Sequence, residues 1–87
     1  MTREDKIRSA LTAALNPLEI ELINDSHLHA GHAGAASGHG HYRVRIISER
    51  FAGQSLIARH RMVYAALGSL METDIHALGI QAQTPQE

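Results

Sequence analysis

One long amphipathic stretch constrains the fold of this chain more than any other feature. Over residues 51–71, apolar side chains recur at three- and four-residue spacing, which places them on one side of a helix of about 3.6 residues per turn. The stripe consists of Leu56, His60, Val63, Leu67 and Leu70, widened by Ile57, Tyr64 and Met71. Ser55 stands where an N-cap would, and Gly68 is expected to weaken the helix, by about 1 kcal/mol relative to alanine, without ending it. So long a stripe must be buried, which predicts a central core helix packed on a sheet.

The rest of the chain supplies that sheet. Residues 18–22, 42–46 and 76–82 alternate apolar and polar side chains, the pattern of half-buried strands. A first helix precedes them. It begins at Thr2, which forms a capping box with Asp5, and it ends at Asn16 because the following Pro17 disfavours helical backbone before it. The expected order is α-β-β-α-β, an α+β fold with a three-stranded mixed sheet packed by helices, in a single domain over residues 1–87.

Charged residues on the first two strands indicate how these strands pair. Glu19 and Glu21 alternate with the apolar positions of the first strand, and Arg43 and Arg45 do so in the second. Opposite charges facing each other across an antiparallel ladder contribute about 0.2–1 kcal/mol per pair. We therefore expect the two strands to pair with their charges on the water-facing side of the sheet.

The topology brings separated histidines together. The second strand, the core helix and the third strand form a βαβ unit, so the third strand should run parallel to the second. His76, which opens the third strand, then lies at the sheet end where the second strand begins. It should be near His41 and within reach of His27, His29 and His32.

Histidine is the residue type that stands out, with seven in the chain and five of them between residues 27 and 41. Four of these five belong to a Gly- and Ala-rich connection over residues 25–40. A connection of this length without periodicity is more often functional or disordered than inert. A metal site is one interpretation, because imidazole suits Zn, Ni and Cu. Solvated loop histidines are the alternative. His60 lies on the helical stripe and is expected to be a packed core residue.

Composition excludes several classes of protein. The chain has no cysteine, so it has no disulfide, no CxxC redox site and no thiolate metal site of its own. The N-terminal MTREDKIR is too charged for a secretory signal, and no run reaches the roughly 18 apolar residues of a membrane helix. We expect a cytoplasmic protein. The sequence has no thiol, no GxSxG motif and no phosphate loop, so we expect a binding module and not an enzyme.

A basic band interrupts an otherwise balanced chain. The net charge is −1, but residues 43–61 contain five arginines and a single glutamate. Arg50, Arg59 and Arg61, near the start of the core helix, could contact phosphates, which dominate nucleic-acid affinity. A solvated helix face is the simpler alternative.

Several motifs resemble those of the BolA family. They are SHLHAGH at 26–32, HYRVRIIS at 41–48, RFAG and SLIARHRMVY between 50 and 64, IHALGI at 75–80 and the final Thr84-Pro85. The resemblance extends from the first helix to Pro85 and implies a small fold similar to the type II KH arrangement. It implies a partner of monothiol glutaredoxins in iron–sulfur cluster trafficking and iron homeostasis. Bacterial members suggest the alternative of a DNA-binding transcriptional regulator of morphology and stress response.

The resemblance also implies cluster ligands. In this family one ligand comes from the loop between the first two strands and another from the histidine that opens the last strand. These positions correspond to His29 and His76, with His32, His27 and His41 as possible substitutes. Because imidazole can replace thiolate on one iron of a [2Fe–2S] cluster, a chain without cysteine could share a cluster with a partner that supplies thiolates.

The partners implied by the resemblance follow from this sharing. We expect no cofactor in the isolated chain, and glutathione from the glutaredoxin side in the complex. Arg50, Ser55, Arg59 and Arg61 are the expected surface for docking the partner or for binding DNA. We expect no membrane partner, and an isolated protein that is a monomer or a weak dimer.

Overall fold

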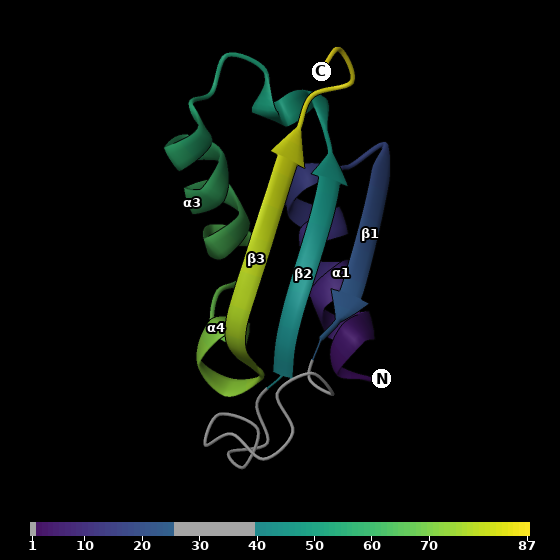
Figure 1. Ribbon diagram of the computed structural model, residues 1–87, viewed down its shortest axis with the longest axis vertical. Helices are drawn as coiled ribbons and strands as arrows, with labels where there is room; N and C mark the ends of the chain where they lie inside the picture. The colour runs from purple at the N-terminus through teal and green to yellow at the C-terminus, as the bar shows by residue number, and fades with distance from the viewer. Residues whose placement is uncertain (1, 26–39) are drawn as a thin grey trace.

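The computed structural model describes residues 2–25 and 40–87, and it contains one three-stranded sheet with helices packed against it (Figure 1). The strands lie in the order β1-β2-β3 and comprise β1 (Glu19–Asn24), β2 (Gly40–Ile47) and β3 (Ile75–Gln83). The helices are α1 (Arg3–Leu15), the 3-10 turn η2 (Glu49–Phe51), α3 (Leu56–Leu67) and the short α4 (Leu70–Thr73). The predicted α+β fold is confirmed, with η2 and α4 added to it.

The sheet has the predicted mixture of strand directions. β1 pairs antiparallel with β2, with Glu21 opposite Arg45, and β2 pairs parallel with β3, with Val44 opposite Ile80. The parallel pairing requires the chain to return along α3 and α4 before it enters β3, as Figure 1 shows. The starts of β2 and β3 therefore lie side by side.

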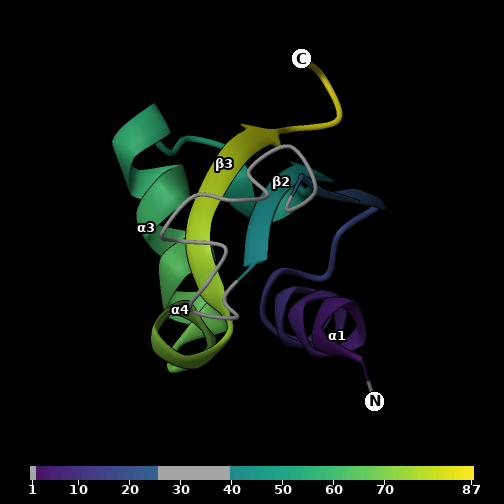
Figure 2. The same ribbon diagram turned by 60° about the horizontal axis from the view of Figure 1, so that its bottom comes forward.

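The core lies between one face of the sheet and the helices. Figure 2 shows α1 and α3 as two separate helices beside the strands. Their inward side chains meet those of the strands in one cluster, in which the buried apolar residues are Ile7, Leu11, Leu15, Tyr42, Val44, Ile46, Phe51, Val63, Leu67, Ile75 and Ala82. In the described residues, no helix is long and apolar enough to cross a membrane.

The predicted ends of α1 are confirmed. The Thr2 hydroxyl accepts a hydrogen bond from the Asp5 backbone N–H at 3.1 Å, and the Asp5 carboxylate accepts one from the Thr2 N–H at 3.3 Å. These two bonds satisfy amide groups that a helix start otherwise leaves without partners. At the other end Asn16 adopts a left-handed conformation, with φ 45°, and closes the helix before Pro17.

The prediction of one continuous helix through Gly68 is wrong. Ser55 caps the start of α3 as expected, with its hydroxyl accepting from the Ala58 N–H at 3.1 Å. Gly68, however, ends α3 with φ 54° and ψ −127°, and α4 begins two residues later. This conformation is open to glycine and strained for other residues. It lets the chain turn toward the start of β3.

The predicted buried stripe of this helix is also only partly right. Val63 and Leu67 are buried, but Leu56 is 68% exposed, and Ile57 and Tyr64 are exposed as well. His60 is half-buried and does not belong to the core. In the described sheet β3 is an edge strand, so no further strand lies beyond it to cover the first turn of α3.

Candidate functional site

Two imidazoles meet at the end of the sheet where β2 and β3 begin. The ring centroids of His41 and His76 are 4.8 Å apart, with 48° between the ring planes. The contact follows from the parallel pairing of β2 with β3, which aligns the first residues of both strands. The predicted proximity of His76 to His41 is confirmed.

A β-bulge determines how His76 is presented. Gly40 pairs with Ile75 and His41 pairs with Ala77, so His76 is the extra residue between two regular pairs. Ile75 is buried and His76 is exposed. A bulge bends its strand and re-aims the extra side chain. The alternating pattern of β3 does not reveal this bulge, which sequence analysis missed.

Gly40 is required at this site because of a close approach. The ring of Tyr42 lies where the Cβ of any other residue at position 40 would have to be. Tyr42 is buried, and its hydroxyl donates a hydrogen bond to a carboxylate oxygen of Glu4 at 2.9 Å. Burial, followed by this contact with Glu4, raises the pKa of the Tyr42 hydroxyl. The start of β2 is thereby attached to α1.

Asp74 attaches the start of β3 to its surroundings. Its backbone carbonyl accepts from the Gly40 N–H at 3.0 Å, and its carboxylate accepts from the Thr73 hydroxyl at 2.6 Å and from Arg3 Nε at 3.4 Å. The Thr73 hydroxyl, together with Lys6 and Arg3, holds the pKa of the Asp74 carboxyl below its usual value. Both strand starts, and with them the two imidazoles, are therefore held by α1 and α4.

The other predicted ligands, His27, His29 and His32, lie outside the described residues. Asp25 and Gly40, the residues on either side of that segment, lie at the end of the sheet that carries His41 and His76, which we call the histidine end. There the Asp25 N–H donates to the His41 carbonyl at 2.7 Å. Within residues 2–25 and 40–87, no three His, Cys, Asp or Glu side chains are grouped so as to hold a metal. The described part of this end supplies two imidazoles, and any further ligands would have to come from residues 26–39 or from another molecule.

The predicted basic residues do not gather in one place. Arg50 is exposed beside the end of α1, near Asn16 and Leu18. Arg59 belongs to α3 and lies beside the last residues of β3. Arg61 is exposed on α3. Ser55 uses its hydroxyl as the helix cap.

The donors of Arg59 are occupied inside the protein. Its guanidinium donates to both carboxylate oxygens of Glu87, at 2.6 and 2.9 Å, and to the backbone carbonyls of Ala82 and Gln54, at 3.1 and 3.0 Å. The Arg59 side chain is only 11% exposed. Arg59, and then the Thr84 N–H, lower the pKa of Glu87 to about 2. The sequence gives no sign of this role of Glu87, because no spacing rule relates a residue in the C-terminal tail to one on α3.

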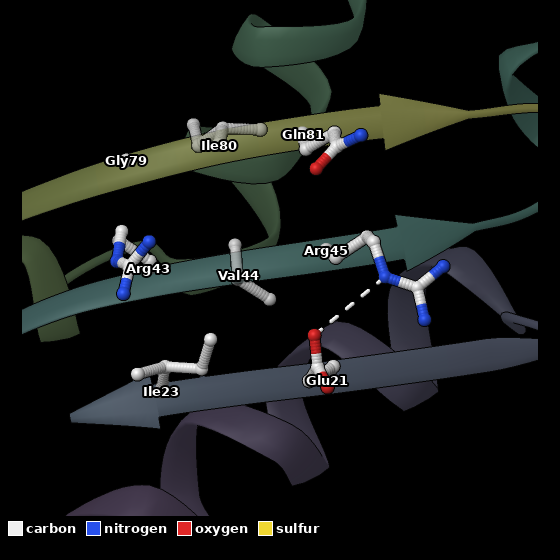
Figure 3. Close-up of a pocket in the computed structure, with 8 residues that line it drawn as sticks. All are labelled: Glu21, Ile23, Arg43, Val44, Arg45, Gly79, Ile80 and Gln81. Atoms are coloured by element: carbon white, nitrogen blue, oxygen red, sulfur yellow. Dashed lines mark ion pairs between the residues drawn. The ribbon is translucent and has the colours of Figure 1, made fainter.

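The open face of the sheet carries the predicted charge pairs. Figure 3 shows Arg43 and Arg45 of β2 between Glu21 of β1 and Gly79 of β3. These residues line a hollow with a volume of about 370 Å³. Arg45 pairs with Glu21 at 3.6 Å and with Glu19 at 3.5 Å, which confirms the pairing across β1 and β2. Arg43 pairs with Asp25 at 2.5 Å. The arginines of this face are therefore balanced by acids of the same chain.

Comparison with known proteins gives a consistent set of relatives. Residues 11–87 match the family model of the BolA-like proteins. BolA-like protein 1 of Bos taurus is 45% identical over 84 residues, which cover 97% of this chain and 60% of that protein. The DNA-binding transcriptional regulator BolA of Escherichia coli is 34% identical over 87 residues, covering 100% of this chain and 80% of the relative.

Some relatives are considerably longer than this chain. SufE-like protein 1 of Arabidopsis thaliana is 42% identical over 91 residues, which represent 99% of this chain but 24% of that protein. This chain spans about three-fifths of the length of BolA-like protein 1 from several mammals.

Solved structures agree with the sequence match. BolA1 from Arabidopsis thaliana superposes with a TM-score of 0.85 at 34% identity, covering 100% of this chain and 96% of the other. The BolA domain of SufE1 from the same plant gives a TM-score of 0.86 at 40% identity, covering 99% and 95%. Because the family match spans most of the chain and the backbone arrangement is shared along nearly its whole length, the chain belongs to the BolA-like protein family.

Proposed function

We propose that this protein is a partner of a monothiol glutaredoxin and shares a bridging [2Fe–2S] cluster with it in iron–sulfur cluster trafficking and iron homeostasis. The observation that carries the proposal is the contact between His41 and His76 at the starts of β2 and β3. Two imidazoles can replace two thiolates on one iron of such a cluster. Membership of the BolA-like family supports this use of the histidine end.

The donor chemistry of the chain fits a shared cluster better than a self-contained one. The chain has no cysteine, so the thiolates of the second iron would come from the glutaredoxin and its glutathione. His76 would be one ligand, because it is exposed at the end of the sheet. The second would be His29, as the family resemblance implies, or His41, whose ring lies beside that of His76; His27 and His32 are the remaining candidates. When bound, the cluster supplies iron and sulfide that can pass to an acceptor protein.

The test is an anaerobic titration of a glutaredoxin dimer carrying a [2Fe–2S] cluster with this protein, followed by visible absorption and circular dichroism. The wild type is compared with His76→Ala, His41→Ala, His29→Ala and His32→Ala. His60→Ala is the matched control, since His60 lies on α3 near the other end of β3 and is the same type of residue. Far-UV circular dichroism of each variant checks that it is folded.

We expect a new visible spectrum with the wild type and with His60→Ala, and loss of this spectrum with His76→Ala and with one other variant. That second variant identifies the other ligand. An unchanged spectrum together with no complex on gel filtration would overturn the proposal. Equal binding of glutaredoxin with and without a cluster would make the protein an adaptor and not a cluster partner.

DNA binding is a second candidate function, because the 34% identical relative from Escherichia coli is named a DNA-binding transcriptional regulator. Arg50 and Arg61 are exposed and available to phosphates, whereas the donors of Arg59 are directed at Glu87. A DNA-binding protein should lose affinity for a duplex steeply between about 50 and 200 mM salt.

In this case Arg61→Gln should weaken binding at every salt concentration and reduce the salt slope, while His76→Ala should change neither. Fluorescence anisotropy with a labelled duplex measures both quantities. An affinity that is insensitive to salt and to Arg61→Gln would exclude this function.

A further inference from the structure

The outer edge of β3 has backbone groups that point away from the sheet. The Gln83 carbonyl accepts from the Ser48 N–H at 2.9 Å and so points toward the chain that continues β2, whereas the Ala82 carbonyl points the other way and accepts from Arg59. Successive backbone groups alternate in direction along a strand. The backbone groups of Leu78 and Ile80 therefore point outward with those of Ala82. Arg59 hydrogen-bonds to this outward side through the Ala82 carbonyl at 3.1 Å.

Between its bulge at His76 and its end at Gln83, this edge carries none of the charged side chains or prolines that keep many edge strands from pairing with another chain. Natural edge strands are protected by charged side chains, prolines or short length. The other edge, β1, carries Glu19 and Glu21, but the nine residues of β3, IHALGIQAQ, include no Asp, Glu, Lys, Arg or Pro. β3 is therefore a long, uncharged strand with an outward side able to pair.

A groove runs along the second half of this edge. It has a volume of about 670 Å³, and the four consecutive residues 80–83 of β3 form one wall. Neighbouring residues of a strand face opposite sides of the sheet, so a wall built from all four is the strand edge itself. The other wall comes from the first turns of α3 and includes Leu56, which is 68% exposed, and Arg59. The groove thus combines one exposed apolar side chain, a cationic group and the outer side of a strand.

Glu87, in the C-terminal tail, indicates which chemical group binds Arg59 in this groove. Both carboxylate oxygens of Glu87 lie on Arg59, and one of them also accepts from the Thr84 N–H at 2.8 Å. A bidentate carboxylate is the ligand that matches the planar guanidinium group. The Glu87 side chain itself is 44% exposed, so another carboxylate can reach Arg59 in its place.

We infer that the β3 edge and this groove bind an extended acidic segment of a partner protein, which adds as a fourth strand and places a carboxylate on Arg59 in place of Glu87. Backbone pairing with Leu78 and Ile80 would supply affinity, and an apolar side chain against Leu56 and Ile80 together with the carboxylate would supply specificity. A second copy of this chain fits less well, because its β3 carries no acid for Arg59. The inference is independent of the proposed cluster, since His76 opens the strand and Arg59 binds at its other end.

The first experiment measures binding of a fluorescein-labelled peptide, VTVEVTVE, by fluorescence anisotropy. A peptide with lysine in place of each glutamate tests the requirement for a carboxylate. Two further peptides carry N-methyl groups on alternate backbone nitrogens. In one peptide the odd-numbered residues are methylated, and in the other the even-numbered residues are. Strand addition predicts that only one of these two methylation patterns abolishes binding, because only one of the two alternate sets of peptide amides faces β3.

Variants of the protein test the role of Glu87. Glu87→Gln should raise the affinity for the acidic peptide about 2–5-fold, the effect of removing one exposed ion pair that competes for Arg59. Glu72→Gln, which removes an equal charge from exposed α4, should leave the affinity unchanged. Arg59→Gln should abolish the preference for glutamate over lysine.

Amide hydrogen exchange then locates the bound peptide. The N–H groups of Leu78 and Ile80 should exchange rapidly in the unbound protein and slowly with the acidic peptide present, while those of β1 should not change. Three results would overturn the inference. They are equal binding of the acidic and lysine peptides, no binding up to about 1 mM peptide, and slow exchange of Leu78 and Ile80 without peptide in a protein that sediments as a dimer.

Discussion

Replacing Gly68 by alanine has opposite expected effects depending on whether the central helix continues or ends at this residue. In a continuous helix the substitution would stabilise the protein by about 1 kcal/mol, because alanine has the higher helix propensity. In the structure Gly68 has φ 54° and ψ −127°, so alanine would adopt a backbone conformation that costs about 1–3 kcal/mol. A Cβ at this position would meet only the Ala65 carbonyl oxygen, at 4.0 Å, so the effect comes from backbone strain and not from a steric clash.

We therefore expect Gly68→Ala to lower the free energy of unfolding by about 1–3 kcal/mol. Urea denaturation followed by far-UV circular dichroism measures this change. The melting temperature should fall by about 4–8 °C for each kcal/mol in a domain of this size. Ala65→Gly is the matched control. It lies on the exposed side of α3 and should cost about 1 kcal/mol by helix propensity alone.

Equal or higher stability of Gly68→Ala would refute the reasoning. It would mean that Gly68 is tolerated inside a continuous helix and that the chain reaches β3 by another route.

Three further predictions concern single side chains. Ser48→Ala should lower the free energy of unfolding by about 1–3 kcal/mol in urea denaturation, because the buried Ser48 hydroxyl donates to the Leu15 carbonyl at 2.6 Å and alanine leaves that carbonyl unsatisfied. An unchanged free energy would mean that water replaces the hydroxyl. Thr2→Ala should cost about 1 kcal/mol through loss of the capping box, and a cost above that of Ser48→Ala would contradict the exposure of this cap. The Glu87 carboxyl should titrate with a pKa of about 2 by NMR, so the stability contributed by its pair with Arg59 is complete above the ordinary value of 4.5 and is lost as the pH falls from there toward 2. In Arg59→Gln the midpoint should rise toward 4.5, and an unchanged midpoint would mean that Arg59 is not the cause.

The predictable part of the candidate site depends on chain order. The alternating pattern of residues 42–46 and 76–82 identifies two strands, and an intervening helix requires that they run parallel. His76 and His41 must then start their strands at the same end of the sheet. The proximity of the two histidines is therefore a consequence of topology, whereas the ring contact at 4.8 Å also depends on the bulge at His76.

The unpredictable part depends on contacts between distant segments. The bulge that presents His76 arises between Gly40 and Ile75, and the ion pair of Arg59 joins α3 to residue 87. Neither has a periodic signal, because each is set by how close two segments come after folding. The exposure of Leu56 is of the same kind. Leu56 lies two helical turns before Val63 and on the same predicted stripe, but Val63 is buried in the core whereas Leu56 is 68% exposed.

Local patterns were sufficient to predict the order of the main elements, the direction of the strands, the caps of α1 and the start of α3, because periodicity and capping act over a few neighbouring residues. Contacts made on folding decided that Gly68 ends α3 and that Arg59 binds Glu87. They also decided that β3 is an edge strand of the described sheet and that Leu56 is exposed. These outcomes depend on which surfaces meet when a three-stranded sheet is covered on one face, and a local pattern carries no information about the segment on the other side of a contact.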